Sequence, residues 1–263
     1  MMPQIFPLAI YGLIGAFVMF SVLWVIAVTR KDAGVVDVGW TCGVGVMAIC
    51  MALLGEGWVP RRVLVGLLGG AWSFRLAAYI LFDRVLTDEE DGRYRRMREY
   101  WGDKANFYFY FFFTSQSLLV VLFALPFVPI AAARHPSIRP WDVLGALVWL
   151  VAIFGEWVAD RQLARFRSNP ANKGRTCREG LWRYSRHPNY FFEWMHWWAY
   201  VVLAVGLGGW WLTLVGPVLM FIFLMRLTGI PYTEKQALAS RGDDYLEYQR
   251  TTSMFIPLPP RRK

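Results

Sequence analysis

Seven apolar runs, each long enough to cross a lipid bilayer, constrain the fold of this chain more than any other feature. A helix needs about 20 mostly apolar residues to cross a hydrocarbon layer of about 30 Å. The runs lie at residues 6–28, 34–54, 62–82, 108–132, 142–160, 190–208 and 210–229. Because they cover more than half of the 263 residues, we expect a single all-α domain over residues 1–263. It would be an integral membrane bundle of about seven transmembrane helices.

Positive charges fall on alternate connections between these runs. The connections after the first, third and fifth runs hold two, six and eight Lys and Arg residues, and the tail from residue 230 holds six. The other connections hold two, two and none. Since cytoplasmic loops are rich in Lys and Arg, this predicts an N-terminus outside and a C-terminus in the cytoplasm. The net charge of +9 then reflects topology and attraction to anionic membrane lipid, and we expect no nucleic-acid partner.

Several ionisable residues interrupt the apolar runs. A charge near the bilayer centre costs at least about 2.5 to 3.5 kcal/mol, so such residues are candidates for function. They are Asp37, Arg75, Glu156, Asp160, Glu193, His196 and Arg226. On the predicted topology all but His196 lie in the cytoplasmic half, where they could form one pocket. The alternative is that each pairs with a neighbour and only stabilises the bundle.

Two polar helix faces flank a strongly basic segment. Asn189, Glu193, His196 and Trp197 share one face, and Glu156, Asp160 and Arg167 share another. Residues 161–190 hold eight Lys and Arg residues among hydroxyl, amide and imidazole side chains. Because guanidinium groups bind phosphates bidentately, this composition favours a phosphorylated ligand. A solvated loop that lies against anionic lipid is the alternative.

Other nucleotide and metal sites are not expected. The sequence contains neither a G-x-G-x-x-G motif after a strand nor a G-x-x-x-x-G-K-[ST] motif. It has only three histidines, too few for a membrane di-iron centre. His187, Glu193 and His196 offer no clear fourth ligand for a zinc ion, so no metal is predicted.

The run GLWRYSRHPNYFFEW at residues 180–194 resembles the C-terminal signature of the steroid 5α-reductase superfamily. Further similar segments are VVDVGW, SFRLAAYILFDR, EDGRYRRMREYWG, and a Y-x-x-Y motif followed by TTSMFIP. The whole chain looks most like the bacterial DUF1295 branch, and residues 140–260 are the most similar part. The resemblance implies a reductase of a bacterial plasma membrane that binds NADPH on the cytoplasmic side.

The resemblance also implies roles for single residues. The residues assigned to cofactor binding are Arg75, Asp160, Arg167, Arg175, Tyr184, His187, Asn189, Tyr190, Glu193, Trp197 and Tyr245. In steroid reductases a glutamate and a tyrosine grip the substrate carbonyl, and the corresponding positions here are Asp37 and Trp72. Trp72 lacks a hydroxyl, and Tyr79, one helical turn past Arg75, is the predicted substitute. The predicted catalytic residues are therefore Asp37, in its protonated form, and Tyr79.

The predicted reaction is reduction of the C=C bond of an α,β-unsaturated ketone by hydride from NADPH. The substrate would be lipophilic, such as a steroid, and would enter from the bilayer. An S-adenosylmethionine-dependent membrane methyltransferase is the alternative, because those enzymes share a similar R-H-P-x-Y-x-x-E run. Asn189 and the many arginines favour the reductase. A non-catalytic membrane interaction protein would leave the polar faces unexplained, and the sequence indicates no oligomeric state.

Overall fold

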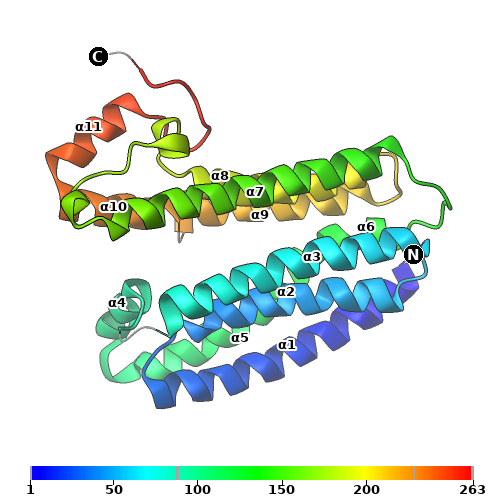
Figure 1. Cartoon of the computed structure of the whole chain (residues 1–263). Helices are drawn as coiled ribbons and strands as arrows, with labels where there is room; N and C mark the ends of the chain where they lie inside the picture. Colours follow the sequence, from blue (N-terminus) through cyan, green and yellow to red (C-terminus); the bar gives the residue numbers. More distant parts are fainter. Residues whose placement is uncertain (1, 87–88, 228, 262–263) are drawn as a thin grey trace. The chain divides into compact units, whose positions relative to one another are not determined.

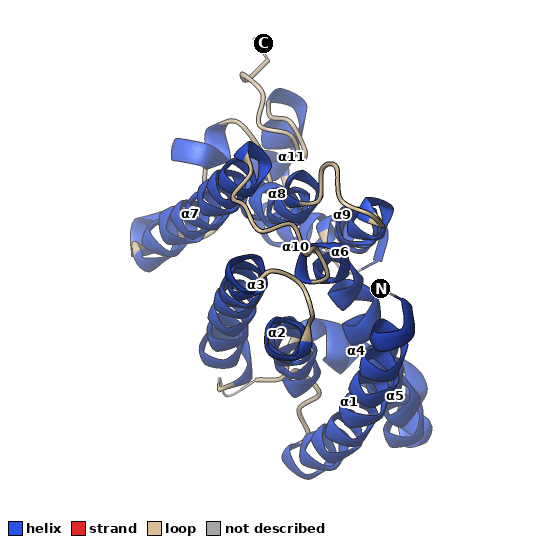
Figure 2. Cartoon of the chain, turned by 90° about the vertical axis from the view of Figure 1, so that its right-hand side faces the viewer, coloured by secondary structure: helices blue, strands red, loops and turns tan. Residues whose placement is uncertain are grey.

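The computed structural model describes residues 2–86, 89–227 and 229–261. This part of the chain consists of helices and their connections (Figure 2). Its only β-structure is an isolated bridge between Ser185 and Ser253. Thr228 of the last predicted run, and Arg262 and Lys263 of the basic tail, lie outside the described residues. The all-α prediction is confirmed.

Six helical stretches are long and apolar enough to cross a membrane, which indicates a multi-pass integral membrane protein. They are Pro7–Arg30, Val35–Leu54, Val59–Val85, Gly92–Ala131, Pro140–Ser168 and Trp210–Arg241. The run predicted at 190–208 forms α8, Pro188–Leu203, with only 16 residues. At 1.5 Å per residue this helix is about 24 Å long, which is less than the hydrocarbon thickness. The count of seven spans and the orientation therefore stay predictions.

The described chain divides into two compact units, and the first comprises residues 1–137 and 206–215. Its helices α1, α2, α3 and α5 lie side by side (Figure 1). The helices of this unit are α1 (Met2–Arg30), α2 (Val35–Leu54), α3 (Val59–Ile80), α4 (Gly92–Trp101), α5 (Ala105–Ala124) and α6 (Val128–Ala131). The run predicted at 108–132 breaks after Ala124, because Pro126 and Pro129 cannot donate the backbone hydrogen bonds of a continuous helix.

Small residues bring α2 and α3 of the first unit close together. A Cβ atom on Gly69 would lie 2.6 Å from Cβ of Ala48, and one on Gly45 would lie 2.4 Å from Oγ of Ser73. The Ser73 hydroxyl also donates a hydrogen bond to the carbonyl oxygen of Thr41. Such close approach is typical of helix pairs inside membranes. It fixes the two helices that carry Asp37, Arg75 and Tyr79.

The second unit comprises residues 138–205 and 216–263. Its helices are α7 (Pro140–Ser168), α8, most of α9 (Val215–Ile222), α10 (Ile230–Arg241) and α11 (Asp243–Thr251). Helices α7 and α8 pack closely, and a Cβ atom on Gly155 would lie 2.4 Å from the ring of Phe192. Helix α7 continues eight residues past the predicted end at residue 160. The first cations of the basic segment, among them Arg167, are therefore helical.

Candidate functional site

A cavity of about 250 Å³ lies at the C-terminal end of α7 in the second unit. Its lining holds four cations and two asparagines but no carboxylate: Leu163, Phe166, Arg167, Asn169, Pro170, Asn172, Lys173, Gly174, Arg175, Cys177 and Arg241. Arg167 and Arg175 were predicted as cofactor residues, and the structure brings them together. Arg241 was missed, because it lies on α10 and nothing in the sequence pairs it with the basic segment.

The turn after α7 shapes this cavity. Asn169 ends the helix and its Oδ1 accepts a hydrogen bond from the backbone nitrogen of Ala171, at 3.0 Å. Nδ2 of Asn172 donates back to the carbonyl oxygen of Phe166, at 2.9 Å. Gly174 then takes a left-handed conformation with φ of 79°, which costs glycine little. The chain thereby reverses and places Lys173 and Arg175 beside the end of α7.

A second set of contacts fixes the far side of the turn on α11. Asp244 accepts hydrogen bonds from the backbone nitrogen of Thr176 at 2.7 Å and from Arg178 at 2.9 Å. Arg178 also pairs with Glu247 at 3.2 Å. Within the described residues, the four cavity cations form no such ion pair with a carboxylate. Their charge is therefore available to an anionic ligand, whereas the charge of Arg178 is used in the fold.

Cys177, which lies between these contacts, is buried at 4% exposure. Burial raises the pKa of its thiol. The side chain is therefore a neutral thiol at neutral pH, and it adds no negative charge to the cation-lined cavity.

Four predicted residues meet where α8 begins. Nδ2 of Asn189 donates to Oδ1 of Asp160 on α7, at 3.1 Å. The rings of His187 and Tyr190 stack with centroids 5.5 Å apart and planes 7° apart. Helix α8 starts at Pro188, where proline is favourable because the first N–H of a helix has no intrahelical partner. Two further predicted residues, Glu193 and Trp197, follow on the same helix and are buried.

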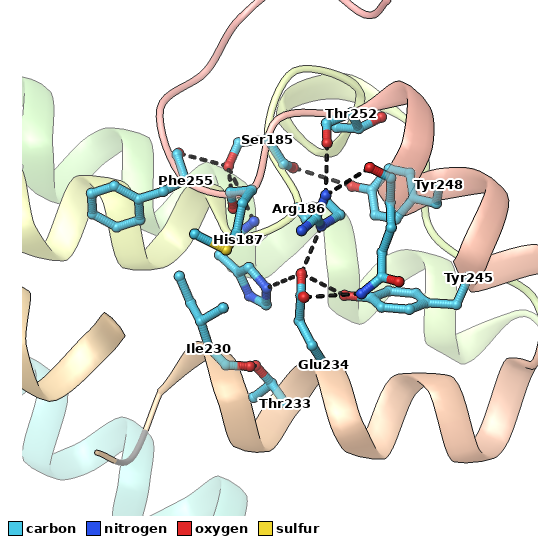
Figure 3. A network of polar contacts seen from close by, with 12 residues as sticks. Ser185, Arg186, His187, Ile230, Thr233, Glu234, Tyr245, Tyr248, Thr252 and Phe255 are labelled. Carbon is cyan, nitrogen blue, oxygen red and sulfur yellow. Dashed lines mark hydrogen bonds and ion pairs between the residues drawn. The ribbon is translucent and has the colours of Figure 1, made fainter. Parts of the chain in front are cut away.

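A half-buried carboxylate, Glu234, adjoins this helix start. Glu234 on α10 accepts hydrogen bonds from Nε of Arg186 at 2.6 Å and from Nε2 of Gln249 at 2.9 Å (Figure 3). Nε2 of His187 lies 3.3 Å away and the hydroxyl of Tyr245 lies 3.4 Å away. The predicted residue Tyr245 thus belongs to this network. The helical spacings did not select Glu234, whose partners come from two other segments, the residues before α8 and helix α11.

Burial has opposite effects on two members of the network. It lowers the pKa of His187, although Glu234 acts in the other direction, so the imidazole is neutral at neutral pH. It raises the pKa of Tyr245, and the negative charge of Glu234 adds to this effect. Tyr184, also predicted, is 42% exposed beside the network, and its carbonyl oxygen accepts a hydrogen bond from the backbone nitrogen of Leu258 at 3.0 Å.

The first unit carries the three remaining predicted residues. Oδ2 of Asp37 pairs with Nη2 of Arg93, and Oδ1 accepts a hydrogen bond from the hydroxyl of Tyr94, both at 2.7 Å. A cation and a hydroxyl donor are the usual partners of an ionised carboxylate. The predicted acid role requires the protonated form instead. Arg75 and Tyr79 lie one turn apart on α3, and Tyr79 is 37% exposed.

Apolar helices and a cation-lined cavity together define a multi-pass helical membrane protein with an anion-compatible surface. The sequence profile described as "Protein of unknown function (DUF1295)" matches residues 23–252, a range that includes every predicted site residue. The chain therefore belongs to the DUF1295 family, which belongs with the steroid 5α-reductase-like proteins. The resemblance predicted from the sequence is confirmed at the level of the family.

The chain is also similar to a yeast protein. The uncharacterized protein C594.04c of Schizosaccharomyces pombe is 26% identical over 281 residues, which cover 94% of this chain and 79% of the yeast protein. No solved structure matches the chain.

Proposed function

We propose that this protein is a membrane-bound, NADPH-dependent reductase of the C=C bond of an α,β-unsaturated ketone. The observation that carries the proposal is the cavity lined by Arg167, Lys173, Arg175 and Arg241. NADPH carries a pyrophosphate and a 2′-phosphate, and guanidinium groups are the side chains best suited to bind them. Asn169 and Asn172 add amide groups to the same lining. The donor set therefore fits the phosphates of this cofactor.

The start of α8 offers groups for the uncharged end of the cofactor. Asn189 and Glu193 supply an amide and a carboxylate, which suit the carboxamide of nicotinamide and the hydroxyls of ribose. Asp160 orients the Asn189 amide through the 3.1 Å hydrogen bond. The further residues that we assign to this end of the cofactor are Tyr184, His187, Tyr190, Trp197 and Tyr245, and Arg75 of the first unit stays a predicted cofactor residue. When bound, NADPH would supply a hydride to the β-carbon of the substrate.

Asp37 and Tyr79 are the proposed catalytic residues on the substrate side. Hydride transfer to the β-carbon leaves an enolate, which a proton donor or positive field at the oxygen stabilises. Asp37 lies beside a hydroxyl, that of Tyr94, and a guanidinium, that of Arg93. We propose that Arg93 holds the Asp37 carboxylate until Asp37 takes a proton from water, which releases the ion pair. The protonated Asp37 would then donate a hydrogen bond to the enolate oxygen, and the α-carbon would take its proton from water.

We propose that the substrate is lipophilic, a steroid or another enone, and that it enters from the bilayer. The exposed faces of the apolar helices, such as Leu147, Val151 and Phe154 on α7, suit contact with lipid. The cofactor would bind from the cytoplasm of a bacterial cell, on the side where the positive-inside rule places the basic segment. Membership in a family grouped with steroid 5α-reductase-like proteins supports the reaction class.

A titration of the purified protein in detergent tests the proposal. A ligand of the folded state raises the thermal midpoint, with a stabilisation of about 2.7 kcal/mol at a concentration of 100 Kd. We expect a larger rise with NADPH than with NADH, because NADH lacks the 2′-phosphate. S-adenosylmethionine carries no phosphate and should have no effect. A rise with S-adenosylmethionine alone would replace the reductase by the membrane methyltransferase.

A further inference from the structure

The network around Glu234 joins three segments that are far apart in the sequence. The carboxylate lies on α10, Gln249 and Tyr245 lie on α11, and Arg186 and His187 directly precede α8 (Figure 3). The side chains of Glu234 and Arg186 are only 16% and 10% exposed. A charge with so little contact to water requires its hydrogen-bonded partner. Removal of the carboxylate would therefore leave the Arg186 guanidinium buried without an acid.

Arg186 carries the connection from α10 to the C-terminal segment. Its Nη1 donates to the carbonyl oxygens of Gln249 at 3.0 Å and Thr252 at 2.9 Å. Its backbone nitrogen donates to the carbonyl oxygen of Ser253 at 2.8 Å. Because Glu234 holds Nε of the same guanidinium, both Nη1 contacts depend on one side-chain orientation.

A neighbour of Arg186 in the sequence, Ser185, also binds the C-terminal segment. Oγ of Ser185 donates to the carbonyl oxygen of Phe255 at 2.8 Å and accepts from the backbone nitrogen of His187 at 3.1 Å. His187 therefore has both its backbone and its ring held, the ring between Glu234 and Tyr190. Helix α8 starts at the next residue, so the direction of its first turn follows from these contacts.

We propose that Glu234 is a positioning residue that, through Arg186 and His187, sets the place of Asn189 and Tyr190 for the cofactor. This inference rests on the proposed function and adds to it a residue outside the cofactor-contacting set. Asn189 and Tyr190 are the first two residues after Pro188, so a shift of His187 reaches them directly. The role differs from that of the cation-lined cavity, which lies at the other end of the basic segment and would hold the phosphates.

The substitution Glu234→Gln tests the inference, with Asp243→Asn as the matched control. Asp243 is an exposed carboxylate at the start of α11, so the control removes the same charge outside the network. In cofactor-free protein, hydrogen–deuterium exchange of residues 186–192 should be faster in Glu234→Gln than in the control. Binding of NADPH should weaken by about tenfold, the effect of one lost hydrogen bond to a charged group.

The ratio of NADPH to NADH affinity separates positioning from general damage. Glu234→Gln should weaken both cofactors by the same factor, because both contain nicotinamide, whereas loss of a cavity cation should weaken mainly NADPH. A fraction that is irreversibly misfolded would lower the amplitude of the signal but leave the Kd unchanged, and a reversibly unfolded fraction would raise both Kd values by the same factor as in a melting-matched control. Unchanged Kd values and unchanged exchange, or an altered NADPH to NADH ratio, would overturn the inference.

A second variant covers the case in which Glu234→Gln does not fold. Arg186→Lys keeps the positive charge but cannot hold Glu234, Gln249 and Thr252 together, and it should show the same two effects. If wild-type protein is not stabilised by NADPH or NADH, the proposed function fails. If wild-type protein is stabilised and both folded variants bind as tightly as wild type, only the role of Glu234 fails.

Discussion

Replacement of Arg167 by Gln addresses the cation-lined cavity directly. Arg167 is one of four cations there, and it extends from the last turn of α7 toward the loop that carries Lys173 and Arg175. Arg167 repels Arg241 electrostatically, although Asp244 attracts it, and no carboxylate is among the described residues that line the cavity. A bound polyphosphate would relieve this repulsion. We therefore expect Arg167→Gln to weaken NADPH binding without a loss of folding stability.

The expected magnitude follows from the position of the side chain. A hydrogen bond to a charged group contributes about 1.5 to 3 kcal/mol when it is well formed. Arg167 is exposed, and screening by salt lowers its contribution to the bottom of that range. A loss of about 1.4 kcal/mol corresponds to a tenfold increase in the Kd. The affinity for NADH, which lacks one of the three phosphates, should fall less.

The assay measures the thermal midpoint of detergent-purified protein against cofactor concentration, from which the Kd follows. Arg165→Gln is the matched control, since Arg165 lies on the same helix, is also exposed and does not line the cavity. The wild-type Kd should increase with ionic strength, and this dependence should be weaker in Arg167→Gln. Equal Kd values for wild type and Arg167→Gln, or equal losses in both variants, would refute the assignment of the cavity to phosphates.

Three further predictions concern pH, the first unit and the turn before α8. Burial lowers the folded-state pKa of His187 below its ordinary value of 6.5, so the unfolded chain binds the proton first and stability should decrease as pH falls below about 6.5. The melting temperature of His187→Asn should decrease less between pH 7.5 and 5.5 than that of the wild type, and an equal decrease would contradict the reasoning. Asp37→Asn should lower the free energy of unfolding by about 1 to 2 kcal/mol, because the variant loses the ion pair with Arg93. It should also abolish turnover of a confirmed substrate, and full turnover would rule out Asp37 as the acid. Gly180→Ala should lower the free energy of unfolding by about 2 kcal/mol, because φ is 56° and the new Cβ would lie 2.3 Å from Nε2 of Gln162. The control Gly242→Ala has a similar φ but no atom within 4 Å of its new Cβ, so it should lower the free energy of unfolding by only about 1 kcal/mol. Equal shifts of the melting temperature in the two variants would disprove the clash.

Helical packing explains which of the predicted contacts the structure contains. The i, i+4 and i, i+7 spacings placed Asp160 and Arg167 on one face of α7, and Asn189 and Glu193 on one face of α8. The Asp160 to Asn189 hydrogen bond is the contact that such faces predict. The ends of helices were predicted less well than their faces. The run at 108–132 breaks at two prolines, and α7 extends to Ser168. Both ends depend on local backbone hydrogen bonds.

Other contacts between residues on different helices could not be predicted from local sequence patterns. Tyr79 on α3 stays the predicted partner of Asp37 at the substrate carbonyl. The structure adds the hydroxyl of Tyr94, which lies 2.7 Å from Oδ1 of Asp37 on a helix that follows a further loop, and no sequence pattern pointed to it. Likewise, Arg241 and Glu234 lie on α10, outside the segment whose basic composition pointed to phosphate. A composition-based prediction finds the arginine-rich segment, but it cannot find single residues that join it from another helix.

The sequence by itself determined the class of the protein. Long apolar runs can satisfy their backbone hydrogen bonds in a bilayer only as helices, and the alternation of charged connections predicts a topology. These properties are local, so they can be read along the chain. The tertiary structure decided which charges meet: four cations around one cavity, and four donors around Glu234. Those sets form because the turn after α7 and the segment after α11 fold back on the helices, and the burial that follows makes each ionisable group depend on partners distant in the sequence.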